Sequence, residues 1–120
     1  MSYDVNNIFA RILRQEIPCN KVFEDEKVLA FHDAYPKAPI HILIIPKGEY
    51  INFHDFHQKA DPDTITHLYK KVVDIIEQYG LREPGYRLIT NCGLNGGQEV
   101  PHYHIHLVGG DKLGTTVGGE

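Results

Sequence analysis

The sequence has few cysteines and no long apolar run. Cys19 and Cys92 are too few for a disulfide scaffold or a four-thiolate zinc site, so we expect two reduced thiols and a cytoplasmic protein. The N-terminal segment carries an acidic Asp4 and lacks the apolar region that a signal peptide needs. No stretch approaches the roughly 20 apolar residues of a membrane span. Export and membrane insertion are therefore not expected.

The sequence also lacks an excess of basic residues. Lys and Arg number 12 against 16 Asp and Glu, which gives a formal net charge of -4. A protein that binds a nucleic-acid polymer needs clustered cations to neutralise a run of phosphates, so we expect no such partner. A single mononucleotide is still a possible ligand, because a few local donors can hold one phosphate.

The length of the chain, 120 residues, fits one domain. No repeat, low-complexity run or linker divides the chain, and 42% of its residues are hydrophobic. We therefore expect a single domain over residues 1–120 that needs no disulfide, metal or cofactor in order to fold.

The apolar pattern predicts two helices and five strands. Apolar residues at helical spacing predict a short helix over about residues 7–14 and a long helix that begins at Pro62 and stops at Gly80. Segments rich in β-branched and aromatic residues predict strands over 21–24, 28–32, 41–45, 86–90 and 102–108, of which the first three are typical of an antiparallel meander. This order predicts an α+β fold with helices packed on an antiparallel sheet.

The clearest chemical signal is a row of histidines in PHYHIHLVGG, where His102, His104 and His106 occupy alternate positions. Strand side chains alternate between faces, so the three imidazoles are expected on one face and the intervening apolar residues in the core. At a rise of about 3.3 Å per residue, neighbouring rings start about 6.6 Å apart. Zinc needs ligand nitrogens within about 2.1 Å, which a straight row of three does not easily supply.

A linear row of imidazoles suits an extended anion. One ring can attack a phosphate while the others donate hydrogen bonds or protonate the leaving group. Two imidazolium groups about 6.6 Å apart repel by about 2.5 kcal/mol at an effective dielectric constant of about 20, so we expect one ring to stay neutral and nucleophilic. His41 heads the apolar segment HILIIP, and the residues alone leave two interpretations: it joins the row from an adjacent strand, or it faces solvent.

The segment HYHIHLV, residues 102–108, resembles the signature of the histidine triad (HIT) family. The segments IFARILRQEIP, VLAFHDAYPKAPIHILIIPK and GGQEVPHYHIHLVGG are each similar to segments of the histidine triad nucleotide-binding (Hint) branch, in the same order and spacing. The resemblance covers almost the whole chain. It implies a HIT-like fold, with a five-stranded antiparallel sheet, two helices and a sheet that extends across a homodimer.

The resemblance further implies an enzyme that hydrolyses the P–N bond of purine nucleoside 5′-phosphoramidates. The family uses a nucleotidyl-histidine intermediate on the middle histidine, here His104, while His102 and His106 orient the phosphate and the nucleophile and handle leaving-group protons. His41 would complete the proton network. The nucleotide contacts that the resemblance implies are Ile8, Phe9, Phe31 and Ala34 at the base, Asp33 at the ribose, and Asn91, Gly97, Glu99 and Val100 at the α-phosphate.

Two positions depart from the family pattern. Glu99 stands where animal members carry serine, although glutamate resembles the bacterial pattern. An acid beside a phosphate would repel it unless it points away or is protonated, so the backbone amide of Glu99 is the expected contact. Pro101 replaces an aromatic residue at the start of the predicted last strand. Three other functions are compatible with the sequence: a nucleotide-binding regulatory protein with incidental hydrolysis, a dinucleoside polyphosphate hydrolase, and a metal-binding protein, which rests on histidine count alone. We expect no bound metal.

Overall fold

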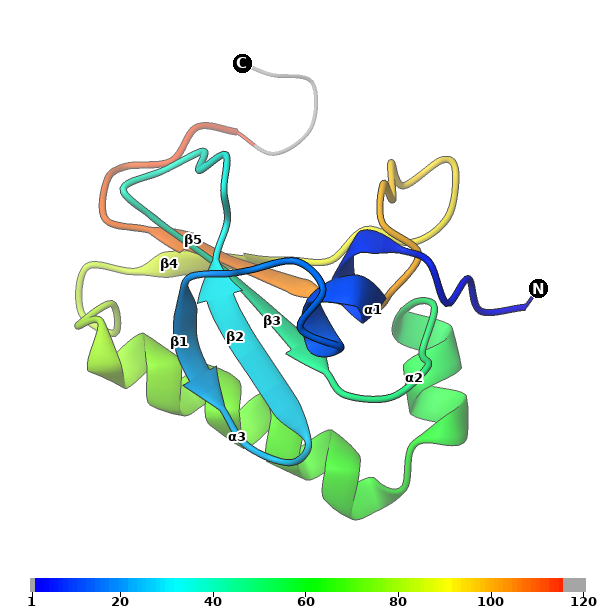
Figure 1. The fold of residues 1–120 in the computed structure, drawn as a ribbon. Helices are drawn as coiled ribbons and strands as arrows, with labels where there is room; N and C mark the ends of the chain where they lie inside the picture. The colour runs from blue at the N-terminus through cyan, green and yellow to red at the C-terminus, as the bar shows by residue number, and fades with distance from the viewer. Residues whose placement is uncertain (1, 116–120) are drawn as a thin grey trace.

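The computed structural model describes residues 2–115 and contains one five-stranded antiparallel sheet (Figure 1). The strand order is β1-β2-β3-β5-β4, so the first three strands form the expected meander and β4 lies at one edge. The strands are β1 Lys21–Glu24, β2 Val28–His32, β3 Ile40–Pro46, β4 Tyr86–Ile89 and β5 Ile105–Gly109. The predicted fold class is confirmed.

Three helices accompany the sheet: α1 Ile8–Leu13, α2 Phe53–Lys59 and α3 Pro62–Gln78. The structure therefore corrects the expected count of two helices. The additional helix, α2, has seven residues, which is too short for helical periodicity to be read from the sequence. Its start is marked by Asn52, whose side chain accepts a hydrogen bond from the backbone N–H of Asp55. None of the helices within residues 2–115 has the length and hydrophobicity that a membrane span requires.

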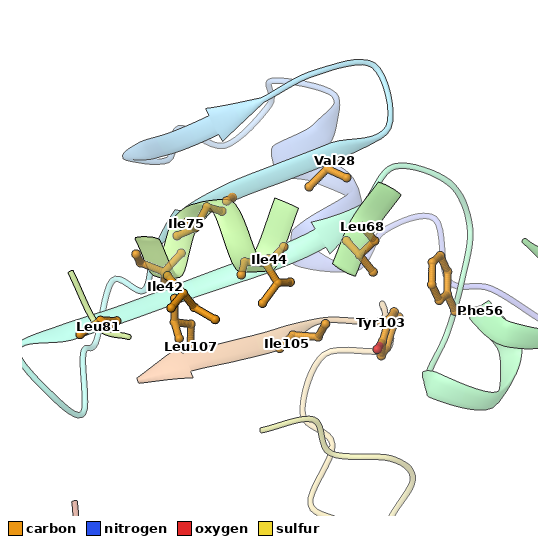
Figure 2. Packing of buried hydrophobic residues seen from close by; sticks show 13 residues of the cluster. Val28, Ile42, Ile44, Phe56, Leu68, Ile75, Leu81, Tyr103, Ile105 and Leu107 are labelled. Carbon is orange, nitrogen blue, oxygen red and sulfur yellow. The ribbon is translucent and has the colours of Figure 1, made fainter. Parts of the chain in front are cut away.

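The main core lies between the sheet and α3. Ile42 and Ile44 of β3 point toward this helix, together with Ile105 and Leu107 of β5. Figure 2 shows these side chains gathered between the two strands and α3. At one end of the core the ring of Tyr103 stacks on Phe56 of α2, with ring centroids 5.0 Å apart. The core therefore fixes one face of β3 and β5.

The opposite face of the sheet carries the short helix α1 and a smaller apolar cluster. This cluster comprises Phe9, Leu29, Phe31, Leu43 and Ile45. Because strand residues alternate between faces, His41 shares this side of β3 with Leu43, and His106 shares it on β5. The α1 side of the sheet is thus where imidazoles and apolar side chains meet.

The main core should dominate stability. Leu107 is completely buried, so Leu107→Ala removes apolar contacts and leaves a cavity, and the free energy of unfolding should fall by about 3 kcal/mol. Leu94 is 95% exposed, so Leu94→Ala is the matched control and should change it by less than about 0.5 kcal/mol. Denaturant unfolding of the two variants measures both values, and equal losses would contradict this description of the core.

Candidate active site

The structure brings four histidines together on the α1 side of the sheet. The rings of His104 and His106 have centroids 5.0 Å apart, and Nε2 of His41 lies 2.9 Å from Nδ1 of His106. Phe9 of α1 packs edge-on against His102 and His104, with centroid distances of 6.3 and 5.0 Å. His41 is only 6% exposed, so of the two interpretations of this residue the structure supports the one in which it joins the row.

The histidine row is not a regular strand along its whole length. Strand β5 begins at Ile105, three residues later than predicted, so His102 and His104 precede the sheet ladder. Hydrogen bonds from outside the ladder hold this segment: Tyr103 N–H donates to the Tyr50 carbonyl (2.8 Å), and the Thr90 hydroxyl donates to the His104 carbonyl (2.9 Å).

This later start of β5 corrects two expectations. The ring spacing of 5.0 Å between His104 and His106 is shorter than the roughly 6.6 Å of a straight strand. Pro101 lies outside β5 and removes no donor from its ladder.

The protonation of His104 follows from one contact. Its Nδ1 lies 2.7 Å from the backbone carbonyl oxygen of His102. A carbonyl can only accept, so Nδ1 carries the hydrogen, and in the neutral ring the lone pair is on Nε2. The middle histidine of the row therefore presents a nucleophilic nitrogen.

His41 and His106 form a second directed pair. The backbone N–H of Lys37 donates to Nδ1 of His41 (3.0 Å), so the hydrogen of the neutral His41 ring is on Nε2. That Nε2–H donates to Nδ1 of His106, which places the hydrogen of His106 on its own Nε2. A carboxylate oxygen of Asp33 lies 3.4 Å from Nε2 of His41, close enough to stabilise a positive charge on the pair. The pair can pass a proton from Nδ1 of His41 to Nε2 of His106 once the Lys37 N–H no longer donates to that Nδ1.

Burial keeps the histidines neutral at pH 7. It lowers the pKa of His102 and of His106 to about 4, and it also lowers the pKa of His104 and of His41. For His106, the neighbouring His104 and His41 add to the effect. The expectation of a neutral ring holds, but removal from water contributes more to it than repulsion among imidazolium groups.

The ring of His102 is buried more deeply than the rings of His104 and His106. It is completely buried, donates from Nε2 to the Pro46 carbonyl (2.9 Å) and accepts from the hydroxyl of Tyr3 at Nδ1 (2.6 Å). Its backbone carbonyl, and not its ring, reaches His104. Tyr3 gave no signal in the sequence, because 99 residues separate it from its partner.

The predicted nucleotide-binding residues all line one cavity of about 260 Å³, beside His104 and His106. They are Ile8, Phe9, Phe31, Asp33, Ala34, Asn91, Gly97, Glu99 and Val100. An adjoining cavity of about 400 Å³ shares four lining residues with it and extends to His41, Lys37 and Arg87. The structure thus places the predicted contacts around a common space.

Gln98 organises the glycine-rich loop between β4 and β5, a role that the sequence analysis missed. Its side-chain nitrogen donates to the carbonyls of Ile51 (2.7 Å) and Val100 (3.0 Å), and its oxygen accepts from the Gly93 N–H (3.0 Å). At Gly96 a Cβ atom would clash with the Cys92 carbonyl oxygen, so the turn requires glycine there. Glu99 is exposed, which leaves its carboxylate free to point away from an anion.

Asp33, His41 and His106 have ligand atoms within 4.8 Å of one another, as a metal site would require. An imidazole that binds a metal through one nitrogen normally donates the other N–H to an acceptor. Nδ1 of His41 instead faces the N–H of Lys37, which is a donor. This donor set fits a hydrogen-bonded proton relay better than a metal centre.

Comparison with known proteins gives consistent matches. Residues 14–113 match the family profile described as HIT domain. A 13.2 kDa HIT-like protein of Azospirillum brasilense is 52% identical over 97% of this chain and 95% of its own length. A protein of Escherichia coli K12 named purine nucleoside phosphoramidase is 47% identical over 89% of each chain.

Solved structures agree with these sequence matches. A histidine triad protein from Clostridium difficile is 40% identical with a TM-score of 0.85, covering 96% of this chain and 99% of that one. The crystal structure of a HIT family hydrolase from Legionella pneumophila is also 40% identical, with a TM-score of 0.84, covering 91% of this chain and 96% of that one.

The buried His102 predicts a stability that decreases in acid. Its pKa of about 4 in the native protein lies below the ordinary 6.5, so between these values the unfolded chain binds a proton that the native protein does not. The free energy of unfolding should fall by about 3 kcal/mol on this account as pH is lowered through that window. Denaturant titrations from pH 7 to 4.5 measure it.

His102→Asn should reduce this pH dependence by the share that His102 contributes, because asparagine does not titrate, while the lowered pKa of His106 continues to contribute. His54→Asn makes the same change at an exposed ring of α2 and should leave the slope as in the wild type. An unchanged slope in His102→Asn would contradict the assignment.

Proposed function

This chain belongs to the HIT family and is a hydrolase of that family, and we propose that it cleaves the P–N bond of purine nucleoside 5′-phosphoramidates. The observation that carries the proposal is the His104 Nδ1–H bond to the His102 carbonyl, which leaves a lone pair on Nε2 of a ring that lines the 260 Å³ cavity. The name of the Escherichia coli relative supports the choice of a phosphoramidate.

The cavity has chemistry that suits a nucleotide. Its apolar end, formed by Ile8, Phe9 and Phe31, can hold a planar base without distinguishing one purine from the other. The Asp33 carboxylate can accept from ribose hydroxyls. The α-phosphate would then lie at His104, where Asn91 and the backbone of residues 97–100 supply donors.

In the first step Nε2 of His104 attacks phosphorus and the P–N bond breaks. The positive charge that develops on the imidazole is stabilised by the His102 carbonyl, which already accepts from Nδ1. When the anionic substrate enters, a proton binds Nδ1 of His41 in place of the hydrogen bond from the Lys37 N–H. The Nε2 hydrogen of His41 then moves to Nδ1 of His106, and His106 gives its own Nε2 hydrogen to the leaving nitrogen, so that a neutral amine departs. The adjoining 400 Å³ cavity offers room for this amine.

In the second step water replaces His104 on phosphorus. Nε2 of His106, which lost its hydrogen in the first step, takes a proton from the attacking water, the new P–O bond forms, and the bond between phosphorus and Nε2 of His104 breaks. The products are a nucleoside monophosphate and the free ring of His104. The proton given up in the first step is thereby returned, and the protein needs no metal or cofactor to balance the cycle.

Turnover of a fluorogenic adenosine 5′-phosphoramidate at pH 7 tests the reaction class. His104→Ala should lower kcat at least about a thousandfold, because the covalent route is lost, while AMP binding by calorimetry is retained. His54→Ala, at an exposed ring outside the cavity, is the matched control and should turn over like the wild type.

A wild-type protein that binds AMP but releases no amine would contradict the proposal and favour a regulatory nucleotide-binding role. Faster cleavage of a diadenosine polyphosphate than of the phosphoramidate would instead favour a dinucleoside polyphosphate hydrolase.

We also propose a homodimer whose two sheets join along β4. This edge strand exposes Tyr86 (44%) and Leu88 (46%), and Val73 of α3 is 56% exposed. An apolar edge strand is a surface that proteins usually cover.

Light scattering after gel filtration should give a dimeric mass for the wild type, whereas Leu88→Glu should give a monomeric one, since a buried carboxylate opposes association. Leu94→Glu places the same charge at a leucine that is 95% exposed and should stay dimeric. A monomeric wild type at micromolar concentration would rule out the proposal.

A further inference from the structure

His102 acts on the candidate site through its backbone and not through its ring. The ring is completely buried, whereas His104 and His106 line the cavity. What His102 supplies to the cavity is the carbonyl oxygen that accepts from Nδ1 of His104. The position of that carbonyl therefore decides where the Nε2 lone pair of His104 points.

The sheet itself does not hold this carbonyl. Strand β5 begins only at Ile105, so the peptide after His102 has no place in the ladder with β3. The His102 side chain is instead fixed at both ring nitrogens, by the Pro46 carbonyl at the end of β3 and by the hydroxyl of Tyr3. A ring bound at two points cannot rotate or exchange tautomers without breaking a buried hydrogen bond.

From these contacts we propose that Tyr3 is a positioning residue for the reaction. Its hydroxyl donates to Nδ1 of His102 at 2.6 Å, holds the ring in the tautomer that donates from Nε2 to Pro46, and so fixes the carbonyl that orients His104. This assignment rests on the proposed hydrolase function and adds a residue outside the histidine row to it.

The N-terminal segment is built to hold Tyr3 in this place. The side-chain amide of Asn7 donates to the Asp4 carbonyl (2.8 Å), and its oxygen caps α1 at the N–H of Ala10 (2.9 Å). Arg14 donates to the Val5 carbonyl at 2.7 Å. Residues 4–7 are thereby tied to both ends of α1, the helix whose Phe9 packs on His102 and His104.

The properties of Tyr3 and His102 agree with a hydrogen bond in which the Tyr3 hydroxyl is the donor. Burial raises the pKa of Tyr3, so the hydroxyl keeps its hydrogen and donates. Nε2 of His102 faces a carbonyl and must donate, which leaves Nδ1 as the acceptor. Tyr3→Phe removes only the hydroxyl and leaves a buried acceptor without its partner.

The expected effect falls on the chemical step. A change outside the site that misplaces a catalytic group by about 1 Å can cost about 100-fold in rate, so Tyr3→Phe, which removes one supporting hydrogen bond, should lower kcat by about tenfold on the fluorogenic phosphoramidate. KM and the Kd for AMP should change little, because Tyr3 does not line the 260 Å³ cavity. Nitrogen-15 NMR of the imidazoles should show a shifted Nδ1 resonance of His102 in this variant.

Tyr79→Phe is the matched control. It also removes a tyrosine hydroxyl that contacts a histidine, here Nε2 of His32 at 3.4 Å, but away from the His102–His104 contact. It should leave kcat and the resonances of His102 and His104 as in the wild type. Melting temperatures of both variants separate a loss of folded protein from a loss of rate.

The inference is overturned if Tyr3→Phe keeps kcat within about twofold of the wild type, or if its loss equals that of Tyr79→Phe. A wild type without turnover means instead that the proposed function has failed. The NMR comparison then decides the inference alone: unaltered His102 and His104 resonances in Tyr3→Phe overturn it, and altered ones support it.

Discussion

The hydrogen bond from Nδ1 of His104 to the carbonyl of His102, 2.7 Å long, is the contact on which the candidate site depends. It assigns the single hydrogen of the neutral ring to the nitrogen that points into the protein and leaves the other nitrogen free to react. The surrounding structure holds the donor and the acceptor of this hydrogen bond in place. The main core fixes β3 and β5, the end of β3 supplies the Pro46 carbonyl that anchors His102, and α1 closes over both rings with Phe9.

Burial supplies the second constraint. Phe9 of α1 covers His102 and His104, and removal of these two rings from water lowers their pKa, which keeps the nucleophile neutral where solvent would allow partial protonation. The same burial makes the native protein sensitive to acid, because the unfolded chain gains protons that the folded chain excludes. A reactive, uncharged His104 and a pH-dependent stability therefore have one physical cause.

The features that could be predicted from the sequence are those encoded by residues close together along the chain. The alternation of His102, His104 and His106 with apolar residues placed Tyr103 in the core, and the apolar runs located all five strands. The sequence could not predict α2, which is too short to show a period. It also could not predict that His102 turns its ring away from the cavity, because that depends on Pro46 and Tyr3, 56 and 99 residues away. Nor could the sequence predict the hydrogen bonds of His41, which depend on the tertiary structure: it accepts from the Lys37 N–H and donates to His106.

The tautomer of His104 is the central claim, and nitrogen-15 NMR of the free protein at pH 7 tests it without any substrate. The account predicts a neutral ring with a protonated, pyrrole-like Nδ1 and an unprotonated, pyridine-like Nε2. A ring protonated at Nε2, or an imidazolium with hydrogen on both nitrogens, would contradict the account, because no lone pair would then be available to attack phosphorus.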